Sequence, residues 1–227
     1  MNAIIQCRLS SSRLKKKSLQ LIGRYSLLEW ILNRLNNSNS LSNVIISTST
    51  QKEDDEIVDF AVSNTLNYYR GSLEDVGDRL LSTALFFKYN SFVRICGDSP
   101  FLDWRLIDNA VKLYELENYD LVTNVFNRTF PKGQSVEIIR TSTFEKYISQ
   151  HRTHSEKEHP TTEFYTNHYN YKILSFTSGG DYGSSQHSID TQEDLVTARN
   201  LVKSDDIINQ SWLEIETSIN SLSYDNG

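Results

Sequence analysis

A short apolar run followed by a cationic, serine-rich loop opens this chain and constrains its fold most. Residues 3–19 read AIIQCRLSSSRLKKKSL, in which Ala3-Ile4-Ile5 fits a buried strand, and an amphipathic helix is expected at 26–35. Hydroxyls and fixed cations bind phosphate oxygens, and α/β sheets bind ligands beyond the carboxyl ends of their strands. The loop therefore predicts a polyphosphate site, with a solvated basic loop as the alternative. Its polar residues are Arg8, Ser10, Ser11, Ser12, Arg13, Lys15, Lys16 and Lys17.

Strand and helix patterns alternate over the first 125 residues. This order predicts an α/β fold with a mixed, mainly parallel sheet and helices on both faces. After residue 126 the alternation breaks at Pro131 and Gly133. Strands are expected at 43–50, 67–70, 91–96, 119–125, 135–139 and 171–176. Helices are expected at 53–64, 72–89, 103–114, 142–150 and 191–202, with a last one in the tail from 205.

Charge is unevenly distributed along the chain, whose net charge is -6. Residues 1–35 hold seven basic side chains against Glu29 alone, and the remainder is acidic. This distribution favours a local pocket for a small anion and disfavours a nucleic-acid partner. No apolar run of membrane-spanning length and no signal peptide is recognised, so we expect no membrane partner and a cytoplasmic location. Cys7 and Cys96 are expected to be reduced and buried.

Two aspartates, each expected to follow a strand, are candidate metal ligands. Asp98 lies in the turn Gly97-Asp98-Ser99-Pro100, and Asp190 lies in the segment Ser188-Ile189-Asp190-Thr191. Mg²⁺ prefers hard carboxylate oxygens and usually takes one or two of them, with the rest from phosphates and water. The alternative is that each aspartate caps the helix that follows it.

Four segments together resemble one known family. They are R-x-S-S-S-R-L-x-x-K after the first strand, R-G-S-x-x-D-V-x-D-R at 70–79, T-F-P-x-G-x-x-V-E at 129–137 and E-x-E-H at 156–159. They are similar to the spore coat polysaccharide biosynthesis protein F group of the acylneuraminate and CMP-Kdo type cytidylyltransferases, over roughly residues 3–200. The resemblance implies a Rossmann-like fold of the glycosyltransferase A type. It also implies an enzyme that joins CTP to an acidic sugar and releases pyrophosphate.

The resemblance also implies roles for individual residues. Arg8, Arg13 and Lys17 would hold the triphosphate and the leaving group, and Asp98 and Asp190 would hold Mg²⁺. Ser72 and Arg79 would lie near the cytosine and ribose. The expected nucleotide-binding residues are Ser10, Ser11, Ser12, Arg70, Ser72, Asp75, Arg79 and Gly97. The expected acceptor-binding residues are Arg94, Asn124, Glu137, Glu158, His159 and Gln186. For Arg94, a structural ion pair with Asp98 or Asp120 stays open.

The chain departs from the group at three places. Lys15-Lys16 replaces a usual Pro-Gly, Ser135 replaces a usual Asp, and Gln186-His187 replaces a frequent Arg-Trp. Two alternatives therefore stay open: a sugar-phosphate nucleotidyltransferase that uses another NTP, and a catalytically weakened nucleotide-binding homologue. The serines argue against the first, because such chains usually open with a glycine-rich loop.

The expected organisation is a nucleotidyltransferase domain at 1–204 and a C-terminal helix with a frayed tail at 205–227. An acceptor-sugar and dimerisation subregion is expected as an insertion at about 126–176. We expect the protein to form a homodimer.

Overall fold

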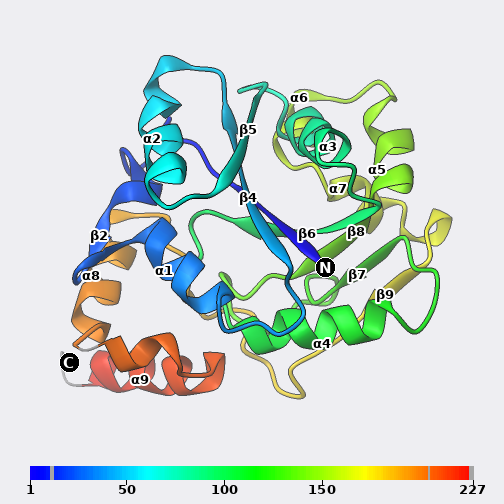
Figure 1. Ribbon diagram of the computed structural model, residues 1–227. Coiled ribbons are helices and arrows are strands. Elements are labelled where there is room, and N and C mark those ends of the chain that lie inside the picture. Colours follow the sequence, from blue (N-terminus) through cyan, green and yellow to red (C-terminus); the bar gives the residue numbers. More distant parts are fainter. Residues whose placement is uncertain (11–12, 204, 225–227) are drawn as a thin grey trace.

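A mixed β-sheet forms the centre of the protein, in a computed structural model that describes residues 1–10, 13–203 and 205–224 (Figure 1). Its strands are β1 Asn2–Gln6, β4 Asn43–Ser49, β5 Asn67–Gly71, β6 Ser91–Cys96, β7 Leu121–Thr123, β8 Glu137–Arg140 and β9 Ile173–Ser175. Their order across the sheet is β5-β4-β1-β6-β8-β7-β9. Neighbours run parallel, except that β8 is antiparallel to β6 and β7. The mixed, mainly parallel sheet is confirmed.

Helices cover both faces of the sheet (Figure 1). They are α1 Leu27–Leu35, α2 Asp55–Ser63, α3 Val76–Phe86, α4 Trp104–Tyr114, α5 Thr141–Ile148, α6 His154–Glu158, α7 Thr162–Thr166, α8 Gln192–Leu201 and α9 Trp212–Tyr224. Successive strand residues point to opposite faces. Ala3 and Ile5 therefore pack with α1, α2 and α4, while Ile4 packs with α3, α5 and α7. Helices α8 and α9 join α1 in a third apolar cluster around Trp30.

Local signals in the sequence fix where several helices begin. Ser26 and Glu29 form a reciprocal capping box at the start of α1, as predicted. Asp103 caps α4, and Thr191 forms a capping box with Asp194 at the start of α8. These side chains satisfy backbone N–H groups that the helix itself leaves without partners.

Several short elements were not predicted. The strands β2 Leu21–Ile22 and β3 Tyr25–Ser26 form a hairpin whose turn holds Gly23 at a positive φ of 61°. Helices α6 and α7 lie in a stretch that the sequence analysis left irregular, because five residues are too few to show helical periodicity. The remaining short turns are η1 Lys17–Leu19, η2 Lys52–Asp54, η3 His168–Asn170 and η4 Asp205–Ile208.

Two buried polar side chains fasten the C-terminal segment to the rest of the protein. Arg34 of α1 is 0 % exposed and donates hydrogen bonds to backbone carbonyls of the 207–210 segment. His187 Nε2 lies 2.7 Å from a carboxylate oxygen of Glu216 in α9. The tail, in which a last helix was expected from residue 205, forms the turn η4 with Ile207 and then the helix α9. The domain boundary at 204 stays a prediction, and residues 225–227 lie outside the described residues.

The buried His187 leads us to expect acid destabilisation. Burial lowers the pKa of His187 below its usual 6.5, although the hydrogen bond with Glu216 acts in the opposite direction. The unfolded chain therefore takes up this proton first. The contribution to stability is present above about pH 6.5 and is lost as the pH falls through the lower folded-state pKa.

We expect the melting temperature of the wild type to fall more steeply on acidification than that of His187→Gln. One titrating proton changes the free energy of unfolding by at most roughly 1.4 kcal/mol per pH unit. Thermal unfolding of both proteins across the acid range from neutral pH measures the difference. Parallel curves for the two proteins would show that His187 does not carry this dependence.

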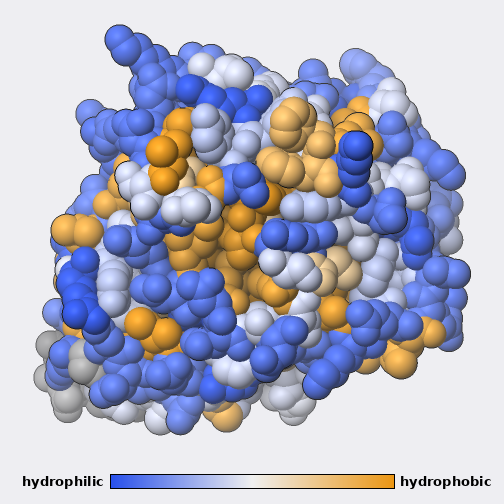
Figure 2. All heavy atoms as spheres, viewed as in Figure 1, coloured by the Kyte–Doolittle hydropathy of each residue, from blue (hydrophilic) through white to orange (hydrophobic). Residues whose placement is uncertain are grey.

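The cavity at the amino ends of β4 and β5 offers little to an anionic ligand. Figure 2 shows hydrophobic residues gathered near the centre of the visible face, over the region where Figure 1 labels β4 and α1. A cavity of about 300 Å³ at the start of β4 and β5 is lined by apolar and neutral polar residues, including Leu35, Leu41, Val44 and Leu66. A cavity lined by charged residues lies instead at the carboxyl ends of β1 and β6.

Among the described residues no helix is long and apolar enough to cross a bilayer.

Candidate active site

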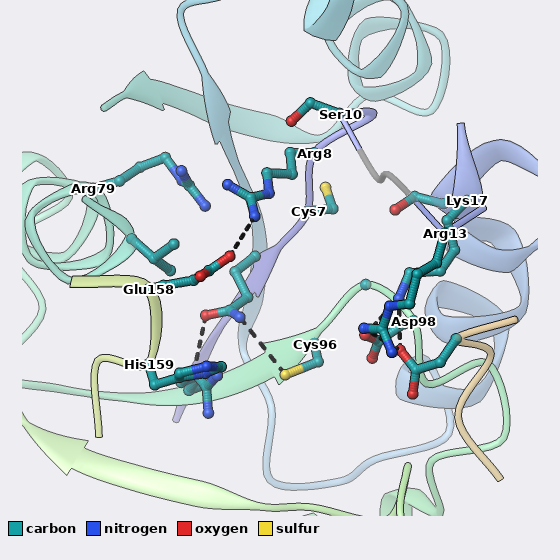
Figure 3. A pocket seen from close by; sticks show the side chains of 16 residues that line it. Cys7, Arg8, Ser10, Arg13, Lys17, Arg79, Cys96, Asp98, Glu158 and His159 are labelled. Atoms are coloured by element: carbon teal, nitrogen blue, oxygen red, sulfur yellow. Dashed lines mark hydrogen bonds and ion pairs between the residues drawn. The ribbon is translucent and has the colours of Figure 1, made fainter. Parts of the chain in front are cut away.

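A cavity of about 390 Å³ opens beyond the carboxyl ends of β1 and β6 (Figure 3). Five cationic side chains and three carboxylates line it, so that an anionic ligand would meet a net positive surface. It brings together eleven predicted site residues: Arg8, Ser10, Arg13, Lys17, Arg79, Arg94, Gly97, Asp98, Glu158, His159 and Asp190. Ser11 and Ser12, also expected here, lie outside the described residues.

The cationic loop reaches the cavity through an unusual backbone conformation at Lys16. Its φ of 51° lies in the left-handed region, which costs a residue with a side chain roughly 1–2 kcal/mol. A glycine would adopt this conformation without that cost. Lys16 is therefore held in a backbone conformation that suits glycine better than lysine. The bend leads directly into η1, whose first residue, Lys17, points its ammonium into the cavity.

Asp98 and Asp190 meet on the Lys17 ammonium. Lys17 Nζ lies 3.0 Å from Asp98 Oδ2 and 3.1 Å from Asp190 Oδ1. Arg13 Nη2 lies 3.6 Å from the same oxygen of Asp190. The backbone N–H of Ile189 donates to the Asp98 carbonyl at 2.8 Å, which holds the two segments side by side. Neither aspartate caps a helix, because Asp103 and Thr191 take those positions.

The charges in this cluster shift the pKa values of its members. Burial disfavours the charged form of Lys17, yet Asp98 and Asp190 outweigh it and raise the pKa of Lys17. Burial likewise opposes ionisation of Asp190, but Lys17, Gln186 and Ser188 lower the pKa of its carboxyl. Lys17 and Asp190 are therefore both ionised at neutral pH.

In each of the two aspartates, neutral donors bind the carboxylate oxygen that does not contact Lys17. Ser99 Oγ donates to Asp98 Oδ1 at 3.1 Å, and Ser188 Oγ donates to Asp190 Oδ2 at 3.2 Å. Gln186 Nε2 also donates to Asp190 Oδ2 at 3.2 Å. The structure thus places Gln186, expected to contact the acceptor, against an aspartate. Such partners fix the orientation of metal-binding side chains.

The two carboxylates fit a magnesium site that a ligand completes. The described residues hold no cluster of three or more His, Cys, Asp or Glu side chains suited to a metal. Mg²⁺ needs only one or two protein carboxylates when phosphates and water supply the other oxygens. Asp98 Oδ2 and Asp190 Oδ1 already converge on one cation, the Lys17 ammonium. The donor set is therefore of the right chemistry for Mg²⁺.

A second group of charges lies at the other end of the cavity (Figure 3). Arg8 Nη2 pairs with Glu158 Oε1 at 2.9 Å, which joins the loop after β1 to the end of α6. Arg79 is 2 % exposed and donates from Nη1 to the Ser72 carbonyl at 2.5 Å. Its Nε finds no hydrogen-bond partner among the described residues. A buried donor without a partner is costly, so the position of Arg79 is not explained by hydrogen bonds within the described residues alone.

The floor of the cavity contains a charge-compensated arginine. Arg94 donates from Nε to Gln6 Oε1 at 2.9 Å and pairs through Nη1 with Glu137, rather than with Asp98 or Asp120. Tyr165 donates its hydroxyl proton to the other oxygen of Glu137. Burial and Glu137 raise the pKa of Tyr165 well above its usual value, so the hydroxyl stays protonated. Glu137 is buried behind Arg94 and orients it.

Besides Glu137 and Gln186, four predicted site residues lie outside the cavity lining. Arg70 donates to the carbonyls of Ser49 and Gln51 and pairs with Asp55. The remaining three also have partners within the protein: Ser72 accepts from the N–H of Asp75, Asp75 forms a bidentate pair with Arg152, and Asn124 bonds the backbone of Gln134 and Val136. Their side chains support the walls, and direct contact with a ligand stays a prediction.

Several lining residues were missed by the sequence analysis, namely Gln6, Cys7, Ser18, Val76 and Cys96. Gln6 pairs with Cys96 across β1 and β6, so both lie at the carboxyl ends of neighbouring strands. Burial raises the pKa of Cys7 to about 12 and that of Cys96 to about 11, so both thiols stay protonated. For Gln6, Cys7 and Cys96 the available signal was their position at strand ends, the same signal that pointed to the cationic loop and to Asp98.

Comparisons with known proteins show which family the chain belongs to. A family model described as cytidylyltransferase matches residues 2–212. An uncharacterised protein of Methanocaldococcus jannaschii is 33% identical over 209 residues, covering 91% of this chain and 84% of that protein. The spore coat polysaccharide biosynthesis protein SpsF of Bacillus subtilis is 25% identical over 210 residues, covering 87% of this chain and 84% of SpsF.

A partial relative and a solved structure extend the comparison. The 3-deoxy-manno-octulosonate cytidylyltransferase of Fusobacterium nucleatum is 28% identical over 123 residues, which is 52% of this chain and 47% of that enzyme. The structure of a cytidylyltransferase from Leptospira borgpetersenii superposes with a TM-score of 0.91 at 29% identity, covering 98% of this chain and 95% of that one. The chain therefore belongs to the cytidylyltransferase family of nucleotidyltransferases.

Proposed function

We propose that this protein transfers a cytidylyl group from CTP to an acidic sugar and releases pyrophosphate. The observation that carries the proposal is the net cationic cavity at the carboxyl ends of β1 and β6, with the Asp98 and Asp190 carboxylates at one end. The name of the Fusobacterium relative, a 3-deoxy-manno-octulosonate cytidylyltransferase, supports this acceptor class. The name of the Bacillus relative, a spore coat polysaccharide biosynthesis protein, supports a role in polysaccharide synthesis.

The residues of the loop would act on the nucleotide by binding and positioning it. Arg13 and Lys17 would pair with oxygens of the triphosphate, and Arg8 would join them after exchanging Glu158 for phosphate. Asp98 and Asp190 would hold Mg²⁺, which would neutralise phosphate charge and polarise the reacting phosphorus. Fixed charges that stabilise the transition state and align the reactants account for most catalysis in such transfers.

The acceptor would lie at the Arg94 and His159 end of the cavity. An oxygen of the sugar would attack the α-phosphorus of CTP, forming a new oxygen–phosphorus bond while the bond to the β-phosphate bridge breaks. The two terminal phosphates would leave as pyrophosphate against Arg13 and Lys17. Because Glu137 compensates Arg94, we expect Arg94 to donate hydrogen bonds to the sugar without adding net charge.

A screen of the four NTPs against a panel of acidic sugars tests the function. We expect pyrophosphate release and a CMP-sugar mass only with CTP, and a larger thermal shift with CTP and Mg²⁺ than with another NTP. Preference for ATP, GTP or UTP would favour the sugar-phosphate nucleotidyltransferase. Nucleotide binding without turnover on any sugar of the panel would favour a catalytically weakened homologue.

Replacing Arg13 with alanine is expected to reduce turnover with little effect on folding. The side chain is 68% exposed, and exposed substitutions usually change stability by less than about 0.5 kcal/mol. Loss of a cation that stabilises the transition state costs roughly 2–4 kcal/mol of barrier, about 30- to 1,000-fold in rate.

The matched control is Arg24→Ala, because Arg24 is 67% exposed and pairs with Asp205 outside the cavity. We expect it to retain the wild-type rate of pyrophosphate release. An Arg13→Ala protein as fast as Arg24→Ala would remove Arg13 from the nucleotide site. Thermal unfolding of both variants separates lost activity from lost folding.

A further inference from the structure

We propose that Lys17 acts as an internal counter-ion that fills the Asp98/Asp190 site until a nucleotide draws it away, so that the divalent cation binds with the nucleotide and not before it. The proposal rests on the proposed function and concerns the order in which its ligands enter. Its starting observation is geometric: one ammonium lies within 3.1 Å of an oxygen from each aspartate.

The Lys17 ammonium lies where a shared cation would have to lie. Ser99 engages the other oxygen of Asp98, and Ser188 and Gln186 engage the other oxygen of Asp190. The oxygens that face each other across Lys17 are therefore those suited to joint ligation of a metal. A metal that takes both of them must displace the ammonium.

Charge balance makes this displacement unfavourable without a nucleotide. Two cations, Lys17 and Arg13, contact the two carboxylates, so the four groups together carry no net charge. A divalent cation that enters would place two positive charges beside the ammonium. At these distances, like charges in a partly desolvated site repel one another strongly. The side chain of Lys17 is only 14% exposed, so water screens this repulsion poorly.

A triphosphate would remove the obstacle by offering Lys17 another partner. The backbone of Lys17 is held in η1, where its carbonyl accepts from the Gln20 N–H at 3.0 Å. The side chain is a flexible four-carbon stem. It can turn from the aspartates toward the cavity that it lines together with Arg13 (Figure 3). Phosphate then pairs with the ammonium, and the metal replaces Lys17 between the carboxylates.

The proposal makes metal and nucleotide binding thermodynamically coupled. By linkage, nucleotide must raise metal affinity by the same factor as metal raises nucleotide affinity. Part of that factor comes from direct contact between metal and phosphate. The part that comes from Lys17 disappears when its charge is removed. The Lys17 contribution is recognised by one result: without nucleotide, the protein binds the metal more tightly when residue 17 carries no charge.

Mn²⁺ binding to the full-length protein, followed by the EPR signal of free Mn²⁺, tests this without turnover. Without nucleotide we expect Lys17→Met to bind one Mn²⁺ at least about tenfold more tightly than the wild type, within the usual range of such couplings. Lys17→Arg keeps the charge and should bind Mn²⁺ as weakly as the wild type. Lys15→Met, an exposed neutralisation in the same loop, should also match the wild type.

A double Asp98→Asn, Asp190→Asn protein gives the background of Mn²⁺ bound elsewhere. Equal Mn²⁺ affinities of wild type and Lys17→Met above this background would overturn the proposal, as would a tight site in the wild type without nucleotide. Lys17→Gln serves the same comparison if thermal unfolding shows that the Met variant does not fold. The proposed function is tested separately. It is contradicted when the wild type releases no pyrophosphate from any NTP, and that result does not affect the comparison of Mn²⁺ affinities.

Discussion

Asparagine at Asp98 or Asp190 is expected to lower cytidylyl transfer at least about a hundredfold, roughly 2.7 kcal/mol of barrier, while the protein still folds. Asparagine has nearly the same shape but no charge, so it weakens metal binding and leaves Lys17 with one carboxylate. The fold should survive because neither aspartate caps a helix and Asp103 and Thr191 remain in place.

The two substitutions should not be additive. Residues that act as one unit lose most of their joint effect when either is removed. We therefore expect the double variant to be little slower than the slower single variant, and both single variants to need more Mg²⁺. Rates of pyrophosphate release at low and high Mg²⁺ measure this.

Asp205→Asn is the matched control, since Asp205 also pairs with an arginine but lies outside the cavity. It should retain the wild-type rate and Mg²⁺ requirement. Near-normal rates in both cavity variants at limiting Mg²⁺ would show that the pair does not hold the metal. A double variant slowed by the product of the two single effects would show that the aspartates act independently.

Replacing Arg34 with methionine is expected to lower the free energy of unfolding by about 3–5 kcal/mol, because several buried carbonyls lose their donor at once. Its guanidinium is completely buried and donates to four backbone carbonyls, those of Leu102, Ile207, Ile208 and Gln210. Methionine fills much of the volume but donates no hydrogen bond. Each buried carbonyl left without a partner costs about 1–3 kcal/mol unless water reaches it.

Urea unfolding at neutral pH measures the change, and Arg199→Met is the control. Arg199 lies in α8, and its side chain donates to the carbonyl of Leu21 in an exposed hydrogen bond. We expect this control to lie within about 1 kcal/mol of the wild type. If Arg34→Met changed the free energy of unfolding as little as Arg199→Met, the 207–210 segment would have to dock independently of Arg34.

Burial lowers the pKa of Arg34 to about 10, so the guanidinium is still charged at the neutral pH of this measurement.

Patterns within single segments were enough to predict most of the fold. The β-branched runs, the amphipathic stripes and the capping residues at Ser26 and Asp103 each depend on neighbours a few positions away. The elements that were missed, α6, α7 and the hairpin of β2 and β3, are too short for such patterns. Nothing local distinguishes β8 as antiparallel, since direction depends on how the chain returns to the sheet.

For the site, the sequence determined which residues gather at the carboxyl ends of the strands. Position after a strand is a local property, and a parallel sheet collects such positions at one edge. Such positions bring Arg8, Arg13, Lys17 and Asp98 to one cavity. The expectation that Asp190 also follows a strand was wrong, because residues 186–190 form no strand and only an isolated bridge pairs Gln186 with Lys132. The sequence could not distinguish side chains that face the cavity from side chains that support its walls, such as Asp75 and Asn124.

Only the tertiary structure decided which charges meet. Lys17 pairs with Asp98 and Asp190 across 81 and 173 positions of the chain, and Arg94 pairs with Glu137 across 43. A charged side chain gains little from any one partner in water, so its local sequence does not select the partner. Burial at the edge of the sheet determines which partner each charge has, because a desolvated charge needs an opposite charge or a hydrogen bond within a few ångströms. Whether Lys17 serves phosphate, metal ligands or both in turn is therefore a property of the folded cavity.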